Sequence, residues 1–149
     1  MIRSREDADF VDCVVLLRDV HETAGYPINW PGDPKTWLTP PNLLGAWVIT
    51  SYGEVAGHVV VSAVDGRATV ERLFVDPKQT GQGLGRQLLD HAVAVAAEQG
   101  LELALDVADN CTAAIALYAR AGWKETGRQP VDWGGDQVSA LISFSAPSS

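Results

Sequence analysis

Three glycines at alternate positions, Gly81, Gly83 and Gly85, mark the point where an apolar run gives way to a helical pattern. Pro77 ends the apolar run, because proline has no N–H to give to a sheet ladder. A turn without Cβ atoms lets a ligand approach the backbone closely, and the first N–H groups of the following helix have no intrahelical partner. The turn is therefore expected to bind an anion, with a phosphate as its ligand.

The spacing of these glycines excludes two common nucleotide-binding loops. A dinucleotide fingerprint needs glycines at relative positions one, three and six. The sixth position is Arg86 when counted from Gly81 and Leu88 when counted from Gly83. A Walker loop ends in Gly-Lys-Ser or Gly-Lys-Thr, whereas arginine and glutamine follow the last glycine here. The phosphate therefore belongs to another kind of ligand.

The predicted elements around this turn are those of an α+β fold. Alternating apolar residues predict three antiparallel strands at 46–52, 55–64 and 68–75, with hairpin turns at Gly53-Glu54 and Asp65-Gly66. Before them we expect a strand at 2–4, a helix from Asp7 and a proline-rich loop at 25–41 with a helical turn at 35–38. After them we expect a helix at 83–99, a strand at 101–107, a helix at 112–120 and a hairpin of 123–127 with 138–144.

Composition and charge limit the kind of protein. Residues 1–149 are expected to form a single domain with a core that needs no disulfide or metal. The net charge of −8 argues against a nucleic-acid partner and mildly favours cationic substrates. We find neither a membrane-spanning run nor a signal-peptide core, so we expect a cytoplasmic protein without a membrane partner, and a homodimer is compatible with the composition. The three histidines and two cysteines lack ligand spacing, so we expect no metal.

A second informative stretch is DNCTAAIALYARAGWKETG, residues 109–127. Asn110 lies between a predicted strand and a predicted helix, where its side chain could cap the helix. Tyr118 lies near the end of that helix, where its phenol could either pack in the core or donate a proton. With the glycine turn, this stretch resembles the motifs of the GNAT superfamily, the acetyl-CoA-dependent N-acyltransferases. The resemblance is specific from Glu71 to Trp123.

The resemblance implies the GNAT acyltransferase fold and direct transfer of an acetyl group from acetyl-CoA, the cosubstrate, to an amine of a small molecule or peptide. A non-catalytic acyl-CoA-binding or sensing module on the same fold is the alternative. Thr80 stands where the family usually has Arg or Gln, and Arg72 and Lys78 are expected to add positive charge near the turn. The residues implied to bind CoA are Phe74, Val75, Gly81, Gln82, Gly83, Leu84, Gly85, Arg86, Asn110 and Ala114.

Two side chains are candidates for the proton transfers that this reaction needs. Tyr118 is implied to protonate the departing thiolate, and Glu71 to accept the proton of the amine, directly or through water. A surface position for Glu71, or a pairing with Arg72, is an equally good interpretation. Period-two alternation puts Glu71, Leu73 and Val75 on one face of the strand. By family analogy the strand bulges near Phe74 and Val75 and frees a backbone N–H for the acyl oxygen.

The acceptor side is expected to involve aromatic residues of two loops. Trp30 in the first loop and Trp133 in the last are the candidates to line an acceptor pocket, with Tyr26 and Trp37 nearby. The same tryptophans could equally pin their loops to the core. Cys111 follows Asn110 closely, but direct transfer needs no acyl-enzyme, so we expect a packing role for it.

Overall fold

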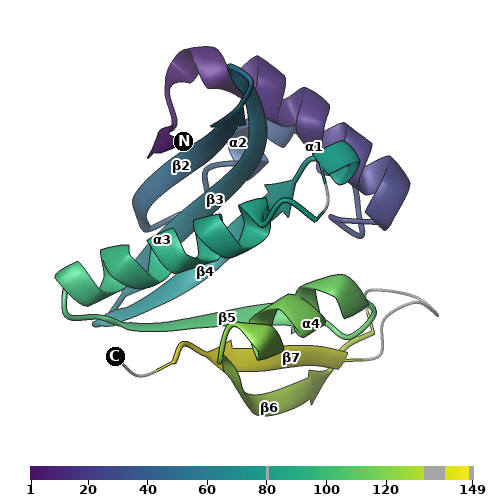
Figure 1. The fold of residues 1–149 in the computed structure, drawn as a ribbon. Coiled ribbons are helices and arrows are strands. Elements are labelled where there is room, and N and C mark those ends of the chain that lie inside the picture. The colour runs from purple at the N-terminus through teal and green to yellow at the C-terminus, as the bar shows by residue number, and fades with distance from the viewer. Residues whose placement is uncertain (80, 133–139, 148–149) are drawn as a thin grey trace.

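The computed structural model describes residues 1–79, 81–132 and 140–147 and is built on a seven-stranded sheet in the order β1-β2-β3-β4-β5-β7-β6 (Figure 1). Neighbouring strands in the described residues are antiparallel except β4 and β5, which are parallel. The strands are β1 (Ile2–Ser4), β2 (Leu43–Ser51), β3 (Glu54–Val64), β4 (Arg67–Val75), β5 (Glu102–Ala108), β6 (Lys124–Pro130) and β7 (Ala140–Ser145). The helices are α1 (Phe10–Ala24), α2 (Pro34–Trp37), α3 (Leu84–Glu98) and α4 (Thr112–Arg120), with 3-10 turns η1 (Asp7–Asp9) and η2 (Pro77–Gln79).

The predicted α+β fold, with a mixed and mostly antiparallel sheet, is confirmed, and so is the order of its elements. The hairpin turn between β3 and β4 has φ of 53° at Asp65 and 80° at Gly66, and positive φ at both central residues is the mark of a type I′ turn. The turn between β2 and β3 lies one residue earlier than predicted. Its positive φ values fall on Tyr52 and Gly53, so Glu54 already belongs to β3.

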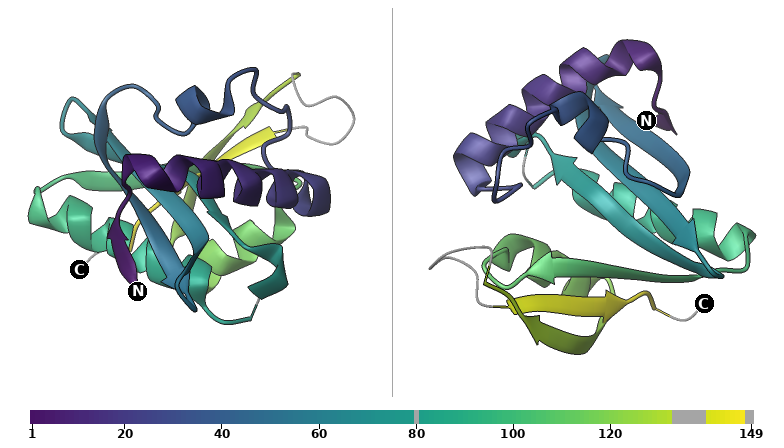
Figure 2. Two further views of the ribbon diagram at one scale, coloured as in Figure 1. Left: turned by 90° about the horizontal axis from the view of Figure 1, so that it is seen from above. Right: turned by 180° about the vertical axis from the view of Figure 1, so that it is seen from behind.

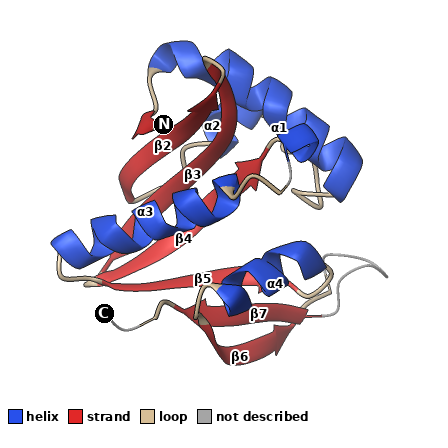
Figure 3. Cartoon of the chain, viewed as in Figure 1, coloured by secondary structure: helices blue, strands red, loops and turns tan. Residues whose placement is uncertain are grey.

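Helices cover the two faces of the sheet unequally. Figures 2 and 3 show α1 and α2 together on one face, and α3 running along the other. The buried residues of α1 recur at three- and four-residue spacing, which makes one apolar stripe that packs with Val48 and Phe74: Cys13, Leu16, Leu17 and Val20. On the opposite face α3 buries leucines and alanines against β3, β4 and β5. None of the described helices has the length and apolar character needed to cross a membrane.

The sheet divides between its two parallel strands. β4 and β5 pair only at their beginnings, from Arg67 with Glu102 to Thr69 with Ala104. Beyond that point the strands separate, as Figure 1 shows, and no further β4–β5 pairing occurs among the described residues. The C-terminal half of β4 therefore offers unpaired backbone groups to whatever lies between the strands.

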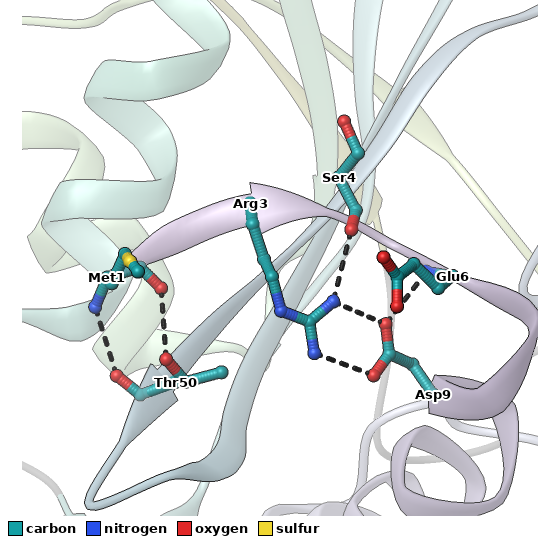
Figure 4. Close-up of polar contacts among 6 residues, drawn as sticks. All are labelled: Met1, Arg3, Ser4, Glu6, Asp9 and Thr50. Carbon is teal, nitrogen blue, oxygen red and sulfur yellow. Dashed lines mark hydrogen bonds and ion pairs between the residues drawn. The ribbon is translucent and has the colours of Figure 1, made fainter.

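An ion pair fixes the N-terminal strand to the helix that follows it. The guanidinium of Arg3 donates to both carboxylate oxygens of Asp9, at 2.7 and 2.9 Å, and the backbone N–H of Glu6 donates to the same carboxylate at 2.7 Å (Figure 4). Asp9 is buried, and its bond to Arg3 lowers the pKa of the carboxyl. The backbone of Met1 joins Thr50 on β2, so β1 and the start of α1 are held on the sheet edge.

Candidate active site

A cavity of about 760 Å³ occupies the gap between the diverging strands β4 and β5. Its walls come from elements that are far apart in the sequence: both strands, the start of α4, and the loop between α1 and α2. A cavity of this size matches a typical small-molecule site. Six of the predicted site residues line this cavity. Three lie on β4 and three lie on α4 or just before it: Glu71, Phe74, Val75, Asn110, Ala114 and Tyr118.

The glycine turn forms a second, smaller cavity of about 430 Å³ at the N-terminus of α3. Gly81 and Gly83 have φ of 86° and 73°, in the left-handed region that favours glycine. Gly83 is the N-cap of α3, and no described side chain caps the helix, so the backbone N–H groups of its first turn are available to an anion. A Cβ on Gly85 would lie 3.3 Å from a Leu117 side-chain carbon, so glycine keeps this wall open.

Two guanidinium groups supply positive charge to this second cavity. Arg86, as predicted, is one of its lining residues and also pairs with Asp90 one turn later at 3.0 Å. Arg120, at the end of α4, is the other, and sequence reasoning missed it because only tertiary packing brings α4 to this turn. The expectation that Arg72 adds charge here is wrong. The Arg72 guanidinium lies over the Trp37 ring at 4.1 Å, on the opposite face of the sheet.

The strand that leads to the turn bulges two residues earlier than expected. Phe74 pairs with His58 and Glu71 with Val60, so two residues of β4 oppose one residue of β3. The extra residue is accommodated at Arg72, whose φ is 54°. The prediction of a bulge near Phe74 and Val75 is therefore corrected to Arg72 and Leu73.

This bulge also overturns the predicted alternation of side chains. Cross-strand partners share a face of the sheet, and His58 and Val60 are two residues apart on β3. Glu71 and Phe74 therefore lie on the same face, the one covered by α1. Val75 pairs with Gly57 and lies on the opposite face, toward α3. A strict period of two fails here because the bulge inserts one residue and shifts the phase.

Glu71 is held in a defined orientation at the cavity wall. The Ser62 hydroxyl donates to its carboxylate at 2.6 Å, and the Arg72 guanidinium lies 3.9 Å away. The predicted pairing with Arg72 is thus present, but it is long and leaves the carboxylate in the cavity lining. The interpretation of Glu71 as a plain surface residue does not fit, since its side chain is about three-quarters buried at 28% exposure.

A second carboxylate faces the cavity from the other strand. Asp106 on β5 lines the cavity and accepts a hydrogen bond from the Ser143 hydroxyl at 2.6 Å. Sequence reasoning missed this residue. The alternation of β5, which buries Leu105 and Val107 and exposes Asp106, was a signal that could have found it. The cavity thus has a carboxylate on each of the two strands that form its walls.

Two side chains on or beside α4, those of Tyr118 and Cys111, have pKa values that burial raises. Tyr118 is 7% exposed, and burial raises the pKa of its phenol to about 12. Its ring packs against Trp123 and Phe144, while its hydroxyl forms no hydrogen bond to the described residues. Burial also raises the pKa of the Cys111 thiol, which keeps the thiol protonated and supports the packing interpretation.

Asn110 does not cap α4. The N-cap residue is Cys111, and the helix start has no side-chain cap bond, so the capping interpretation of Asn110 is wrong. The Asn110 side chain is exposed, lines the larger cavity, and accepts only a long 3.7 Å contact from the Cys111 thiol. Its amide is therefore accessible to a ligand in the cleft.

The tryptophan that lines the cavity differs from the one expected. Trp37, the last residue of α2, and Tyr26, in the loop between α1 and α2, line the cavity with their rings 6.0 Å apart. Trp30 instead packs against α1, where its ring lies 5.4 Å from His21 and below the Arg18 guanidinium at 4.5 Å. Trp30 is therefore not among the residues that line the cavity, contrary to the prediction, because its ring packs against α1 and holds the loop there. Trp133 lies outside the described residues, and Gln82 is exposed beside the turn.

A bulged strand that diverges from its parallel neighbour, followed by a glycine turn at a helix N-terminus, defines an acyltransferase-like architecture. The model of the Acetyltransferase (GNAT) family matches residues 12–123. The chain therefore belongs to the GNAT acetyltransferase family, and the resemblance found in its motifs is confirmed.

Individual relatives point the same way. The peptidyl-lysine N-acetyltransferase YjaB of Salmonella typhimurium is 33% identical over 87 residues, which cover 58% of this chain and 54% of that protein. The chain spans about half the length of the curated relatives it matches. The crystal structure of the ribosomal-protein-S18-alanine N-acetyltransferase from Escherichia coli aligns with a TM-score of 0.78 and 27% identity, over 99% of this chain and 92% of that one. A Bacillus anthracis structure in complex with acetyl coenzyme A aligns with a TM-score of 0.64 and 21% identity, over 74% of this chain and 65% of that one.

Proposed function

We propose that this protein is an N-acetyltransferase that moves an acetyl group from acetyl-CoA directly to a primary amine. One observation supports this most strongly: Val75 and Ala113 line both cavities, so the anion site at α3 continues into the cleft that contains Tyr118. A substrate with a pyrophosphate at one end and a thioester at the other fits this route. Family membership and the acetyl-CoA complex of a structural neighbour agree with it.

The residues around the glycine turn fit the pyrophosphate. The amides of Gly83, Leu84, Gly85 and Arg86 and the guanidinium groups of Arg86 and Arg120 are the donors for its oxygens. The pantetheine arm would then run along the free edge of β4 and pair with its backbone as an added strand would. Asn110 and Ala114 close the other side of the arm.

The proton of the acceptor amine leaves on the acidic side of the cleft. A free alkylammonium has a pKa near about 10, so it must lose a proton before its nitrogen can attack the thioester carbon. Glu71 is the acceptor that we propose, directly or through a water molecule, because Ser62 holds its carboxylate in the cavity wall. Asp106 on the facing wall is the competing candidate. The two carboxylates also favour a cationic acceptor in the cleft.

As the amine nitrogen bonds to the acyl carbon, the carbonyl oxygen gains negative charge, which a backbone N–H freed by the β4 bulge would stabilise. The carbon–sulfur bond then breaks, and the sulfur takes the electron pair. We propose that Tyr118, which lines the cavity, donates its hydroxyl hydrogen to this sulfur. Since a phenol with a raised pKa is a weaker acid than a thiol with a pKa near about 8.5, its main contribution is a strong hydrogen bond, and solvent completes the protonation.

The acceptor that we propose is the amine of a peptide or protein. Relatives and neighbours act on the alanine of a ribosomal protein or on peptidyl lysine, as their names state. The carboxylates of Glu71 and Asp106 in the cavity walls favour the cationic amine that a peptide N-terminus or a lysine side chain carries. Because acetyl-CoA is made and used inside the cell, the same proposal places the protein in the cytoplasm.

A thiol-release assay with acetyl-CoA tests the activity and the acceptor together. The panel contains peptides with a free N-terminal alanine, peptides with a blocked N-terminus and one lysine, and small primary amines. Acetylation of one class identifies the acceptor. Calorimetric binding of CoA without thiol release from any amine would instead indicate the acyl-CoA-binding module.

Two single substitutions identify the base. Glu71→Gln and Asp106→Asn each keep the shape and hydrogen-bonding capacity of the side chain but remove its charge. Loss of the true base should lower kcat by about 100-fold or more and remove the acidic limb of the pH profile, whereas the other variant should mainly raise KM for a cationic acceptor. Retention of the acidic limb in Glu71→Gln contradicts our assignment.

A further inference from the structure

His58 lies directly beneath the bulge of β4. Its side chain is fully buried, and its ring stacks on Phe74 with centroids 4.9 Å apart. Nδ1 of His58 lies 2.8 Å from the backbone carbonyl oxygen of Arg72. A carbonyl oxygen can only accept, so Nδ1 is the nitrogen that carries the hydrogen. The residue at the centre of the bulge is therefore held by a side chain of the neighbouring strand.

The other ring nitrogen is held by an arginine from a distant part of the chain. Nη1 of Arg5 lies 2.9 Å from Nε2 of His58, and a guanidinium can only donate. The same guanidinium donates to the carbonyl oxygen of Leu38 at 2.8 Å and to the hydroxyl of Thr39 at 2.6 Å. These contacts fix the tautomer of His58 and link it to the two residues that directly follow Trp37, the last residue of α2.

A bulge needs such a contact because it interrupts the ladder. Arg72 has the left-handed φ of 54°, which costs a residue with a Cβ about 1 kcal/mol or more relative to the right-handed regions. Its carbonyl also loses the regular partner that an uninterrupted ladder would supply. The hydrogen bond from Nδ1 replaces that partner. The side chain of Arg72 is held as well, because its Nε donates to the backbone carbonyl oxygen of Trp37 at 2.9 Å.

From this geometry we infer that His58 is a positioning residue for acyl transfer: its Nδ1–H, with Arg5 on Nε2, sets the bulge that aims a β4 backbone N–H at the acyl oxygen. The inference rests on the proposed acetyl transfer. His58 is not itself a lining residue of the cavity, so its effect reaches the reaction only through the two β4 lining residues that it touches, Arg72 and Phe74. A chain of hydrogen bonds through Arg5 and His58 also connects the residues that follow α2 to the bulge at Arg72.

The charges around His58 keep its ring neutral. Burial together with the nearby guanidinium groups of Arg5 and Arg72 lowers its pKa to about 4. One face of the ring stacks on Phe74 of β4, and Val48 of β2 is its cross-strand partner. The Nδ1–H tautomer is therefore present throughout the neutral range, and the bulge should not loosen between pH 5 and 8.

Two substitutions separate the hydrogen bond from the volume of the ring. His58→Phe keeps a planar ring against Phe74 but has no donor for Arg72. His58→Asn is smaller, and its side-chain amide can place an N–H near the position of Nδ1. Val48→Ala is the matched control. Val48 on β2 is the cross-strand partner of His58 on β3 and is equally buried, but its side chain makes no hydrogen bond to the bulge.

We expect His58→Phe to lower kcat by about 10- to 100-fold at saturating substrates with little change in the dissociation constant of CoA, because a misaimed N–H weakens only the developing oxyanion. His58→Asn should recover most of the lost kcat despite its smaller volume. Val48→Ala should lose thermal stability yet keep its kcat. Equal kcat in His58→Phe and the parent overturns the inference, as does a loss in Val48→Ala that matches His58→Phe.

Nitrogen NMR of the parent protein with labelled histidine gives an independent readout. A neutral ring with its hydrogen on Nδ1 at pH 5 to 8 is the expected signature, and the opposite tautomer overturns the inference even if every variant unfolds. If the parent protein shows no thiol release, the proposed function fails. The tautomer would still report whether His58 holds the bulge.

Discussion

Replacing Tyr118 with phenylalanine tests the role of the phenol in the cleft. The substitution removes one hydroxyl and leaves the ring that packs against Trp123 and Phe144. A hydrogen bond to a charged group contributes about 1.5–3 kcal/mol, and each 1.36 kcal/mol corresponds to one factor of ten in rate. We therefore expect kcat to fall by about 10- to 100-fold in the thiol-release assay, with CoA affinity nearly unchanged.

The same variant makes a second prediction about stability at high pH. Burial raises the pKa of Tyr118 from 10.0 to about 12, so the folded state keeps this proton in a range where the unfolded state has lost it. Because the unfolded state then binds fewer protons, stability falls as pH rises through this window. The loss is on the order of 3 kcal/mol across the two pH units. Tyr118→Phe should remove this part of the alkaline destabilisation in urea unfolding curves.

Tyr52→Phe is the matched control, because Tyr52 is 98% exposed in the β2–β3 turn and lines neither cavity. It should change neither kcat nor the slope of stability with pH. Full turnover of Tyr118→Phe at saturating acetyl-CoA and acceptor would refute the assignment of the phenol. An unchanged alkaline slope would refute the account of its burial.

Three further predictions concern the turn, the N-terminal ion pair and the partly buried His91. Gly83→Ala and Gly53→Ala both place a Cβ at positive φ in open space and should each lose about 1 kcal/mol of stability, but only Gly83→Ala should weaken CoA binding in calorimetry. Asp9→Asn should lower the free energy of unfolding by about 2 kcal/mol at pH 7. Because Arg3 lowers the pKa of Asp9, the stabilisation is lost when the carboxyl is protonated, so the difference in urea unfolding should vanish as pH falls below 3.8. His91→Phe should raise thermal stability, since the buried Nε2 has no partner among the described residues, and the gain should grow below pH 6.5, because burial lowers the pKa of His91.

Local patterns in the sequence were sufficient for most of the elements and for the glycine turn at the start of α3. The Asp65-Gly66 turn predicted its hairpin because both residues tolerate positive φ, and Pro77 with the three glycines predicted the break between β4 and α3. These features depend on neighbours within a few residues. The positions of Tyr118 and Asn110 on or beside α4 followed in the same way from the helical pattern and the family motif.

The geometry of the cleft depended on contacts that no local pattern contains. The alternation of β4 side chains shifts at Arg72, where His58, 14 residues earlier in the chain, holds the backbone carbonyl of the bulge. Arg5 in turn holds the His58 ring. Once the phase shifts, Glu71 turns to the face of α1, and alternation alone predicts the wrong neighbours for it. Arg120 and Asp106 joined the site for a similar reason, since helix and sheet packing brought their elements to the cleft.

The sequence by itself therefore determined the order of the elements, the glycine turn before α3 and the family, because each depends on residues that are close together along the chain. Only the tertiary structure decided where β4 bulges, which tryptophan lines the larger cavity and which carboxylates lie in its walls. The physical reason is that these choices are made by hydrogen bonds and packing between segments that meet only after folding, such as Trp37 with Arg72 and Ser62 with Glu71.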